Sequence, residues 1–385
     1  MEYGLTEEQR EIRTMVREFA QQRIKPVRAR LDEKEEFPRF ILDELGRMDL
    51  SGLFIPKEYG GVGGGCLDFI LVIEELSRVC VGVSVSYAAS ALGAYPIIFG
   101  GNDDQKRRFL SPLATGEKLC AFALTEPNAG SDAAGIRTTA VAKGDRYVLN
   151  GSKQWITNGG EAELYSVIAM TDRSKGARGA SCFVLEKGMP GFTFGKKERK
   201  LGINASATRE LVFEDCEVPR ANLIGREGMG FILTMKTLDH SRPGVGAQGV
   251  GLAQSALDEA VTYARHRVQF DKPISANQAI QHMLADMATR VEAARCLVYA
   301  ACRTIDRGTK DISKIASMAK LFASDVAMQV TTDAVQVLGG YGYMRDYPVE
   351  KMMRDAKILQ IYEGTNQIQR NIIGGELIKE YASRG

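Results

Sequence analysis

The sequence is poor in the residues that build disulfide frameworks and metal sites. Its seven cysteines are odd in number, scattered along 385 residues and without a Cys-x-x-Cys pair. Its three histidines show no ligand spacing. These features argue against a disulfide scaffold and a zinc site, and they fit a reducing compartment.

The chain also lacks a strong excess of charge and a targeting segment. The formal net charge is +2, from 50 basic and 48 acidic residues, so composition gives no case for nucleic acid, a membrane surface or an acidic partner. The first residues, MEYGLT, have neither a basic region nor an apolar core, and no apolar run approaches the length of a membrane span. We therefore expect a cytoplasmic protein, or a processed one in a mitochondrial matrix, with no nucleic-acid or membrane partner.

What is present is ordinary for a globular protein of two or three domains. Hydrophobic residues make up 44% of the chain and charged residues 25%. Thr6 and Gln9 have the spacing of a capping box, and apolar residues then recur at helical intervals. Similar periodicity over residues 40–48 and 67–79 predicts an all-helical domain over residues 1–118.

The pattern changes near Leu119, where short runs of alternating or β-branched residues replace the helical periodicity. Clusters of Gly, Asn, Asp and Pro separate these runs. Closely spaced short strands with turn signals predict a small β barrel or sandwich over residues 119–224. The predicted strands are residues 119–124, 138–142, 147–149, 165–170, 182–185 and 210–213.

Helical periodicity returns from about residue 225 and predicts a four-helix bundle over residues 225–385. The order helix, strand, helix indicates an α+β fold and argues against a doubly wound parallel sheet. Residues 244–249 (GVGAQG) match the letters of a dinucleotide-binding fingerprint. A helical stretch containing Pro243 precedes them where a strand is required, so we take the match to be false.

Glu363 is the only acid in the stretch ILQIYEGTNQIQR. Helical stripes lie before it, over residues 349–359, and after it, over residues 366–378. Gly364 frees the backbone between the two stripes, and Thr365 can cap the second helix through its hydroxyl. We therefore expect Glu363 on a short junction between packed helices, which can hold one side chain still in a cavity.

Three motifs resemble those of a known family. Residues 362–369 (YEGTNQIQ) resemble the segment around the catalytic base of the acyl-CoA dehydrogenases. Residues 122–132 (FALTEPNAGSD) resemble their flavin-binding strand and loop, and residues 155–158 (WITN) resemble the segment along the isoalloxazine ring. With further matches elsewhere, the resemblance covers nearly the whole chain. It implies FAD as cofactor and a homotetramer, a dimer of dimers, in which each FAD also touches a neighbouring subunit.

The resemblance implies FAD contacts from several separate segments. They are Phe122, Leu124, Thr125, Gly130, Ser131, Trp155, Ile156, Thr157, Arg267, Phe270, Gln278, Gln336, Val337, Gly339, Gly340, Thr365 and Gln367. Those between Arg267 and Gly340 match positions that reach the FAD of a neighbouring subunit. Asp271 stands where the family usually has a glycine, which departs from the pattern at this turn and adds a negative charge near the pyrophosphate.

The resemblance also implies contacts to an acyl-CoA substrate and to a redox partner. The substrate residues are Ser131, Asp239, Arg242, Tyr362 and Gly364, with Arg242 expected at the nucleotide part. Ser241 holds the position where some family members carry their catalytic Glu, so Glu363 has no obvious rival. Glu198 matches a position that can meet the electron-transferring flavoprotein, the expected electron acceptor. A solvated charged loop explains Glu198 equally well.

Dehydrogenation of an acyl thioester to a trans-2-enoyl-CoA requires a base for the α proton and an acceptor for the β hydride. Side chains cannot accept a hydride, so a flavin or nicotinamide is obligatory. The ordinary pKa of a Glu, about 4.3, is too low for this base unless a dry site raises it. We therefore expect Glu363 in a site that loses water when substrate binds. The resemblance implies that the Glu363 backbone amide and a ribityl hydroxyl of the flavin hold the thioester carbonyl.

Other activities of the same fold stay open. An acyl-CoA oxidase would give its electrons to oxygen, although such oxidases are usually much longer. A glutaryl-CoA-type dehydrogenase would carry an arginine near residue 84, where this chain has Ser84. Flavin monooxygenases of the fold generally lack the Glu, and a non-catalytic scaffold would have lost it. Within the leading hypothesis, Tyr95 and Tyr362 predict a short, medium or compact branched or cyclic acyl chain.

Overall fold

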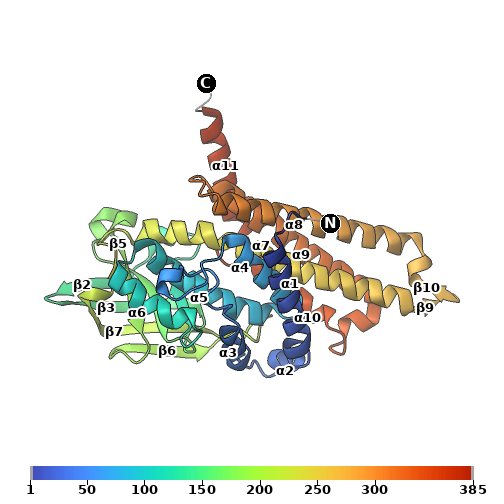
Figure 1. The fold of residues 1–385 in the computed structure, drawn as a ribbon, viewed down its shortest axis with the longest axis horizontal. Coiled ribbons are helices and arrows are strands. Elements are labelled where there is room, and N and C mark those ends of the chain that lie inside the picture. The colour runs from blue at the N-terminus through green and yellow to red at the C-terminus, as the bar shows by residue number, and fades with distance from the viewer. Residues whose placement is uncertain (1–2, 383–385) are drawn as a thin grey trace.

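The computed structural model describes residues 3–382, which form a helical part, a β-sheet and a second helical part in chain order (Figure 1). This confirms the predicted α+β arrangement. The side chains of Thr6 and Gln9 each accept from the other's backbone N–H, at 3.2 and 3.1 Å, so the predicted capping box is present. The first helices are α1 (Glu7–Phe19), α2 (Arg28–Glu33), α3 (Arg39–Arg47), α4 (Cys66–Ser77), α5 (Val81–Gly100) and α6 (Asp103–Ala114).

An eight-stranded sheet follows, in the order β6-β7-β3-β2-β4-β5-β8, with β1 pairing parallel to β4. All seven residues of β4 are buried, so the core of the sheet centres on this strand. The structure extends the predicted strands β3 and β7 to 12 residues each and adds β6 and β8. The strands are β1 (Cys120–Ala123), β2 (Thr139–Lys143), β3 (Arg146–Thr157), β4 (Leu164–Met170), β5 (Ala180–Glu186), β6 (Phe192–Lys197), β7 (Thr208–Pro219) and β8 (Leu223–Ile224).

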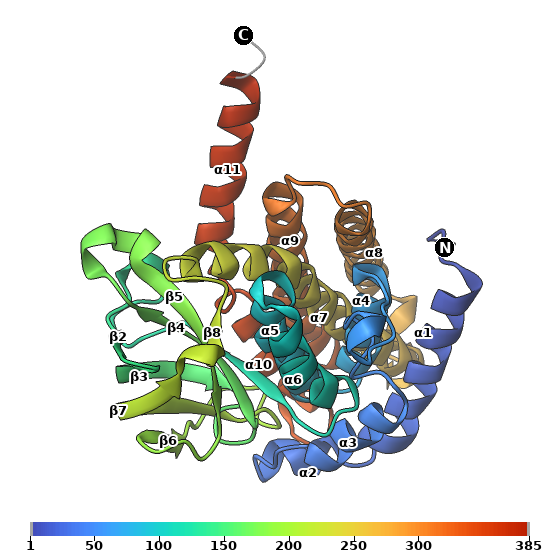
Figure 2. The same cartoon turned by 60° about the vertical axis from the view of Figure 1, so that its left-hand side comes forward.

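The last part is a bundle of long helices in which α7, α8 and α9 pack against one another. In Figures 1 and 2, α11 projects away from this body. The predicted domain limits at residues 118 and 224 stay predictions; β1 begins at Cys120, and α7 begins at Gly230. The elements are α7 (Gly230–His266), β9 (Val268–Gln269), β10 (Lys272–Pro273), α8 (Gln278–Asp306), α9 (Ser313–Leu338), α10 (Val349–Leu359) and α11 (Asn366–Ala382).

The glycine-rich residues 244–249 lie inside α7, so no strand precedes them and the dinucleotide match is false, as predicted. Their glycines serve helix packing. A Cβ on Gly246 would come within 2.8 Å of the Val298 side chain, and one on Gly249 within 2.7 Å of the Ala323 carbonyl. Small residues therefore let α7 approach α8 and α9 closely, as tight helix packing requires.

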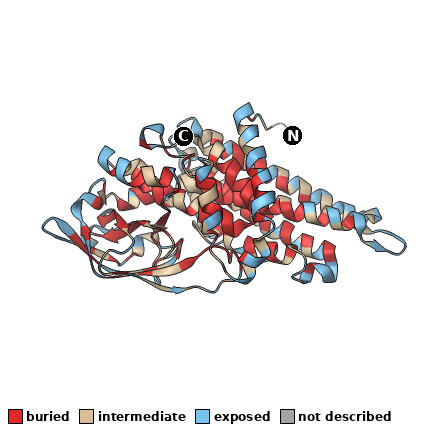
Figure 3. Ribbon diagram, turned by 60° about the horizontal axis from the view of Figure 1, so that its bottom comes forward, coloured by how far each residue is buried: buried red, intermediate tan, exposed pale blue. Residues whose placement is uncertain are grey.

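Helix α5 corrects one expectation from the sequence. It is 20 residues long and apolar enough to span a membrane by length and composition, whereas we expected no such segment. In the structure 78% of its apolar window is buried, and it packs against β1 and α7. Figure 3 shows that buried residues concentrate in the middle of the molecule, where such a helix serves as core.

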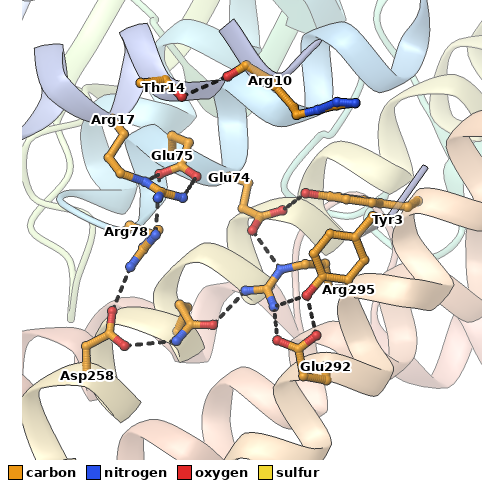
Figure 4. A network of polar contacts seen from close by, with 12 residues as sticks. Tyr3, Arg10, Thr14, Arg17, Glu74, Glu75, Arg78, Asp258, Glu292 and Arg295 are labelled. Atoms are coloured by element: carbon orange, nitrogen blue, oxygen red, sulfur yellow. Dashed lines mark hydrogen bonds and ion pairs between the residues drawn. The ribbon is translucent and has the colours of Figure 1, made fainter. Parts of the chain in front are cut away.

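A buried polar network joins the first helices to the last ones (Figure 4). Arg295 of α8 donates from Nε to Glu74 of α4 at 2.9 Å and from Nη2 to Gln254 of α7 at 2.7 Å. Tyr299 donates to the second carboxylate oxygen of Glu74 at 2.8 Å. Glu74 and Arg295 are both almost fully buried, and Glu292 of α8 also pairs with Arg295, so Glu74 depends on Arg295 for neutralisation whereas Arg295 has two carboxylate partners.

Glu74→Gln should therefore lower the thermal unfolding midpoint by several degrees. The change removes the Glu74 charge and leaves Arg295 with Glu292 as its one carboxylate partner, with an expected loss of about 1–3 kcal/mol for the weakened buried hydrogen bonds. The matched control is Glu44→Gln, which breaks the more exposed pair with Arg23 and should leave the midpoint nearly unchanged. Scanning calorimetry measures both variants, and equal shifts would contradict the prediction.

Candidate functional site

Glu363 lies on a junction between α10 and α11, as the sequence predicts. Its φ of 51° is left-handed, and Gly364 follows with φ 91°. Gln369 of α11 donates from Nε2 to the carbonyls of Glu363 and Gly364, at 3.2 and 3.0 Å. The Thr365 hydroxyl accepts from the Ile368 N–H at 3.3 Å, so it caps α11 as predicted. The junction is thus fixed through its backbone.

The Glu363 carboxylate is half-buried and accepts a hydrogen bond from Ser241 Oγ of α7 at 2.5 Å. Burial raises the pKa of this carboxyl, while the Ser241 bond and the charges of Lys320 and Arg242 lower it. The two positions at which the resemblance allows a catalytic Glu, 241 and 363, therefore lie in contact. A carboxylate on either side chain would reach nearly the same place.

Two buried polar residues at this junction were not predicted from the sequence. Lys320 of α9 donates from Nζ to the Gly364 carbonyl at 2.8 Å. Gln248 of α7 accepts a hydrogen bond from the Tyr362 hydroxyl, next to Glu363. Lys320 could have been noticed as the one lysine within the alanine-rich buried stripe of α9, whereas Gln248 was hidden inside the glycine-rich stretch.

The predicted substrate residues Asp239 and Arg242 lie on α7, beside Ser241. Arg242 is only 3% exposed, and its Nη1 donates to Asp239 at 2.5 Å and to Ser317 at 3.4 Å. Burial lowers the pKa of Arg242, and Asp239 opposes that effect. The structure thus turns Arg242 toward the buried side of Glu363, and its contact with a nucleotide stays a prediction.

The predicted flavin residues of the sheet come from two adjoining segments. The Gln154 N–H donates to the Thr125 carbonyl at 2.8 Å, which joins residues 122–125 to residues 155–157. A register shift between Lys153 and Ile156 gives Trp155 a φ of 57° and leaves its side chain 60% exposed. The bulge therefore presents the indole on the surface of the sheet.

A buried ion pair holds the loop that carries Gly130 and Ser131. Glu126 accepts from Lys153 Nζ at 2.7 Å and from the backbone N–H groups of Arg137 and Thr138, at 2.6 and 2.9 Å. These bonds lower the pKa of Glu126 against the effect of its burial. The two ends of the loop are thereby tied together, and Gly130 and Ser131 lie between them.

The predicted residues of the C-terminal part gather at the far end of the bundle. A hollow of about 520 Å³ is lined by Arg267, Val337, Gly339, Gly340 and Tyr341, among others. Gln336 lies on α9 immediately before Val337, and Gln278 is the first residue of α8. The structure thus brings together residues that lie about seventy positions apart in the sequence.

The hairpin of β9 and β10 lies beside this hollow. Phe270 and Asp271 form its two-residue turn with φ of 51° and 60°, and Phe270 is 92% exposed. A turn of this kind requires positive φ at both positions, which aspartate tolerates better than most residues. Asp271 therefore keeps the turn that the usual glycine would make.

These two groups of predicted flavin residues lie at opposite ends of the molecule. In Figure 1, β3 is at one end of the long axis and β9 and β10 at the other. A Cβ built on Gly130, Gly339 or Gly340 would meet no atom within 4 Å, so both ends leave room for a ligand. With the exposed Trp155 ring, this space fits a flavin nucleotide. Thr365 lies on the junction between α10 and α11, and Gln367 lies in the first turn of α11, so they belong to neither group.

Three family descriptions match successive parts of the chain. "Acyl-CoA dehydrogenase, N-terminal domain" matches residues 6–117, and "Acyl-CoA dehydrogenase, middle domain" matches residues 121–216. "Acyl-CoA dehydrogenase, C-terminal domain" matches residues 228–378. Together the three descriptions extend over most of the chain.

Similar proteins match over nearly their full length. A short-chain specific acyl-CoA dehydrogenase of Clostridium acetobutylicum is 50% identical, covering 98% of this chain and 100% of that protein. The structure of butyryl-CoA dehydrogenase from Megasphaera elsdenii has a TM-score of 0.95 at 48% identity, covering 97% of this chain and 99% of that one. A structure described as the electron transferring flavoprotein of Acidaminococcus fermentans includes a chain with a TM-score of 0.96 at 52% identity, covering 98% and 99%.

Ser241→Ala should raise the pKa of the Glu363 carboxyl. A hydrogen bond to the charged form of a carboxyl lowers its pKa, and a bond to a charged group is worth about 1.5–3 kcal/mol, or about 1–2 pKa units. Infrared titration of the protonated carboxyl band measures the change, with Glu363→Gln to assign the band. An unchanged midpoint would show that Ser241 does not support the charged form.

Proposed function

Because the chain belongs to the acyl-CoA dehydrogenase family, we propose that Glu363 removes the α proton of a short-chain acyl-CoA in an FAD-dependent dehydrogenation to the trans-2-enoyl-CoA. Family membership establishes an FAD enzyme acting on acyl-CoA thioesters. The roles of individual residues and the length of the acyl chain are the proposal. Bound FAD supplies the hydride acceptor that no side chain can provide.

The observation that carries the proposal is the environment of the Glu363 carboxylate. Its carboxylate is half-buried, accepts from Ser241 and has a pKa raised by burial, as a base for a weakly acidic carbon requires. Within residues 3–382, no protein group accepts a hydrogen bond from the Glu363 N–H. That N–H can therefore donate to the thioester carbonyl and stabilise the negative charge that develops when the proton leaves.

The residues at the two ends of the molecule would hold FAD across a subunit interface. Residues 122–125, the loop with Gly130 and Ser131, and Trp155 would contact the flavin half from one subunit. The hollow beside Arg267 and the exposed Phe270 would contact the adenine half from another. Separation of the two groups along the long axis supports this arrangement, and with it the homotetramer.

We propose the electron-transferring flavoprotein as the electron acceptor, supported by the similarity to a chain in a structure described by that name. Glu198 accepts from Gln154 Nε2 at 3.3 Å, one residue before the exposed Trp155. Both residues therefore lie on one surface near the proposed flavin. An acyl-CoA oxidase stays the alternative that rapid reaction with oxygen would reveal.

Substrates with a distal carboxylate are disfavoured. Helix α5 contains no charged residue over its whole length, so it has no arginine to pair with such a group. The Tyr95 ring of α5 stacks on Phe99 at 5.5 Å and lies 6.2 Å from His240, the neighbour of Ser241. Aromatic side chains therefore occupy the region next to the Glu363 carboxylate, which leaves room for a short or compact acyl chain.

Tyr95→Ala should shift the preference of the enzyme toward longer acyl chains. Removing the ring opens space for one or two further methylenes, each worth about 1–3 kcal/mol in discrimination, so we expect at least about a tenfold change in the hexanoyl-to-butyryl ratio of kcat/KM. Steady-state kinetics with a series of straight-chain acyl-CoAs measures it. Equal turnover of very long chains by the unaltered protein would refute the proposed chain length.

Glu363→Gln should leave the protein yellow and able to bind acyl-CoA but abolish flavin reduction. The amide keeps the size of the side chain and removes the base. Anaerobic addition of a panel of acyl-CoAs to both proteins, followed by the flavin absorbance band, checks this. Undiminished bleaching in the variant would move the base elsewhere, and rapid reoxidation of the unaltered protein by air would favour an oxidase.

A further inference from the structure

Lys320 places a fully buried ammonium group beneath the Glu363 junction. Its Nζ donates to the Gly364 carbonyl and to Asn366 Oδ1, both at 2.8 Å. These acceptors are one and three residues after Glu363. Lys320 itself lies on α9, in a buried stripe that otherwise contains mostly alanine, valine and serine.

Each acceptor has a second donor besides Lys320. The Gly364 carbonyl also accepts from Gln369 Nε2 at 3.0 Å. The Ser324 hydroxyl donates its one proton to Asn366 Oδ1 at 3.2 Å or to the Leu321 carbonyl at 3.1 Å, and it accepts from Asn366 Nδ2 at 2.9 Å. Lys320 therefore adds to the junction both hydrogen bonds and a positive charge.

That charge is unfavourable for folding. Burial lowers the pKa of Lys320 from 10.5 to about 7, so the folded protein holds this proton less tightly than the unfolded chain. The ammonium therefore destabilises the fold as pH falls below 10.5, and the full effect is present below about pH 7. Stability does not explain a lysine at this position.

The neighbouring charges of Arg242 and Asp325 have ion-pair partners of their own, although Arg242 also lowers the pKa of Glu363. Arg242 of α7 is paired with Asp239 at 2.5 Å, and Asp325 of α9 is paired with Arg370 of α11 at 3.0 Å. Within the described part of the chain, neither Lys320 nor Glu363 has an ion-pair partner within 4 Å. Each nevertheless stabilises the charged form of the other, so they act as a pair at longer range.

We propose that Lys320 is a positioning residue for the base: its buried ammonium group holds the junction and supplies the charge that keeps Glu363 ionised when acyl-CoA excludes water. The proposal rests on the role of Glu363 given above. Water exclusion strengthens the attraction between two buried charges, so the effect of Lys320 grows as the substrate binds. Lys320 carries its full charge on the acid side of its pKa of about 7.

The test is Lys320→Met, which keeps the length of the side chain and removes the charge, with Lys320→Gln as a second neutral variant. Lys314→Met is the matched control, because Lys314 lies on the same helix and pairs with Glu380 away from the junction. FAD absorbance and the thermal midpoint report on folding. We expect Lys320→Met to retain its FAD absorbance. Its thermal midpoint should be retained or raised, because a destabilising buried charge has been removed.

Two measurements then test whether the charge of Lys320 keeps Glu363 ionised. Infrared titration of the carboxyl band that disappears in Glu363→Gln should show a midpoint raised by about one unit or more in Lys320→Met. The acid limb of kcat/KM for flavin reduction should move to higher pH by the same amount, because more Glu363 is protonated at a given pH. Lys314→Met should leave both unchanged.

The outcomes separate this inference from the proposed function. A carboxyl midpoint and an acid limb unchanged in both neutral Lys320 variants would overturn the inference, even with Glu363→Gln inactive. A lowered thermal midpoint with an unshifted acid limb would also overturn it, because it would assign Lys320 a purely structural role. Retained flavin reduction in Glu363→Gln would instead show that the proposed base is wrong.

Discussion

The constraint on which the site depends is the burial of a carboxylate that has no close ion-pair partner. In its proposed role as base, Glu363 must lose much of its hydration to become strong enough, yet it must stay ionised at neutral pH. The structure meets both demands by holding the charged form with the Ser241 hydroxyl and with the longer-range charges of Lys320 and Arg242. A direct ion pair would have kept Glu363 ionised but made it a weaker base.

The fold supplies these groups because α7 and α9 pack closely on either side of the junction. Glycines in α7 allow this approach, since a Cβ on Gly246 or Gly249 would meet α8 or α9 at less than 3 Å. The same helix α7 contributes Ser241, which donates to Glu363, and Gln248, which accepts from Tyr362. The glycine-rich stretch that imitates a dinucleotide fingerprint thus has a packing role next to the Glu363 junction.

The proposed arrangement of the cofactor imposes a second constraint, because it requires residues from two subunits. Trp155 and the loop with Ser131 are at one end of the molecule, and the hollow beside Arg267 is at the other. Neither end by itself encloses a flavin nucleotide. The protruding hairpin with its exposed Phe270 is the kind of surface that a second copy would cover. Assembly and cofactor binding are thus expected to depend on each other.

The sequence by itself determined the order of helices and strands, the junction at Glu363 and the family, because periodicity, caps and long motifs are local in the chain. From the sequence we expected no apolar segment of membrane-spanning length, and α5 is one. Its burial in the core explains why it is long and uncharged. The sequence also missed Lys320 and Gln248, and it could not show that Arg242 is buried. Those features were decided by tertiary structure, because the field at a buried carboxylate comes from side chains on separate helices whose distances no local pattern encodes.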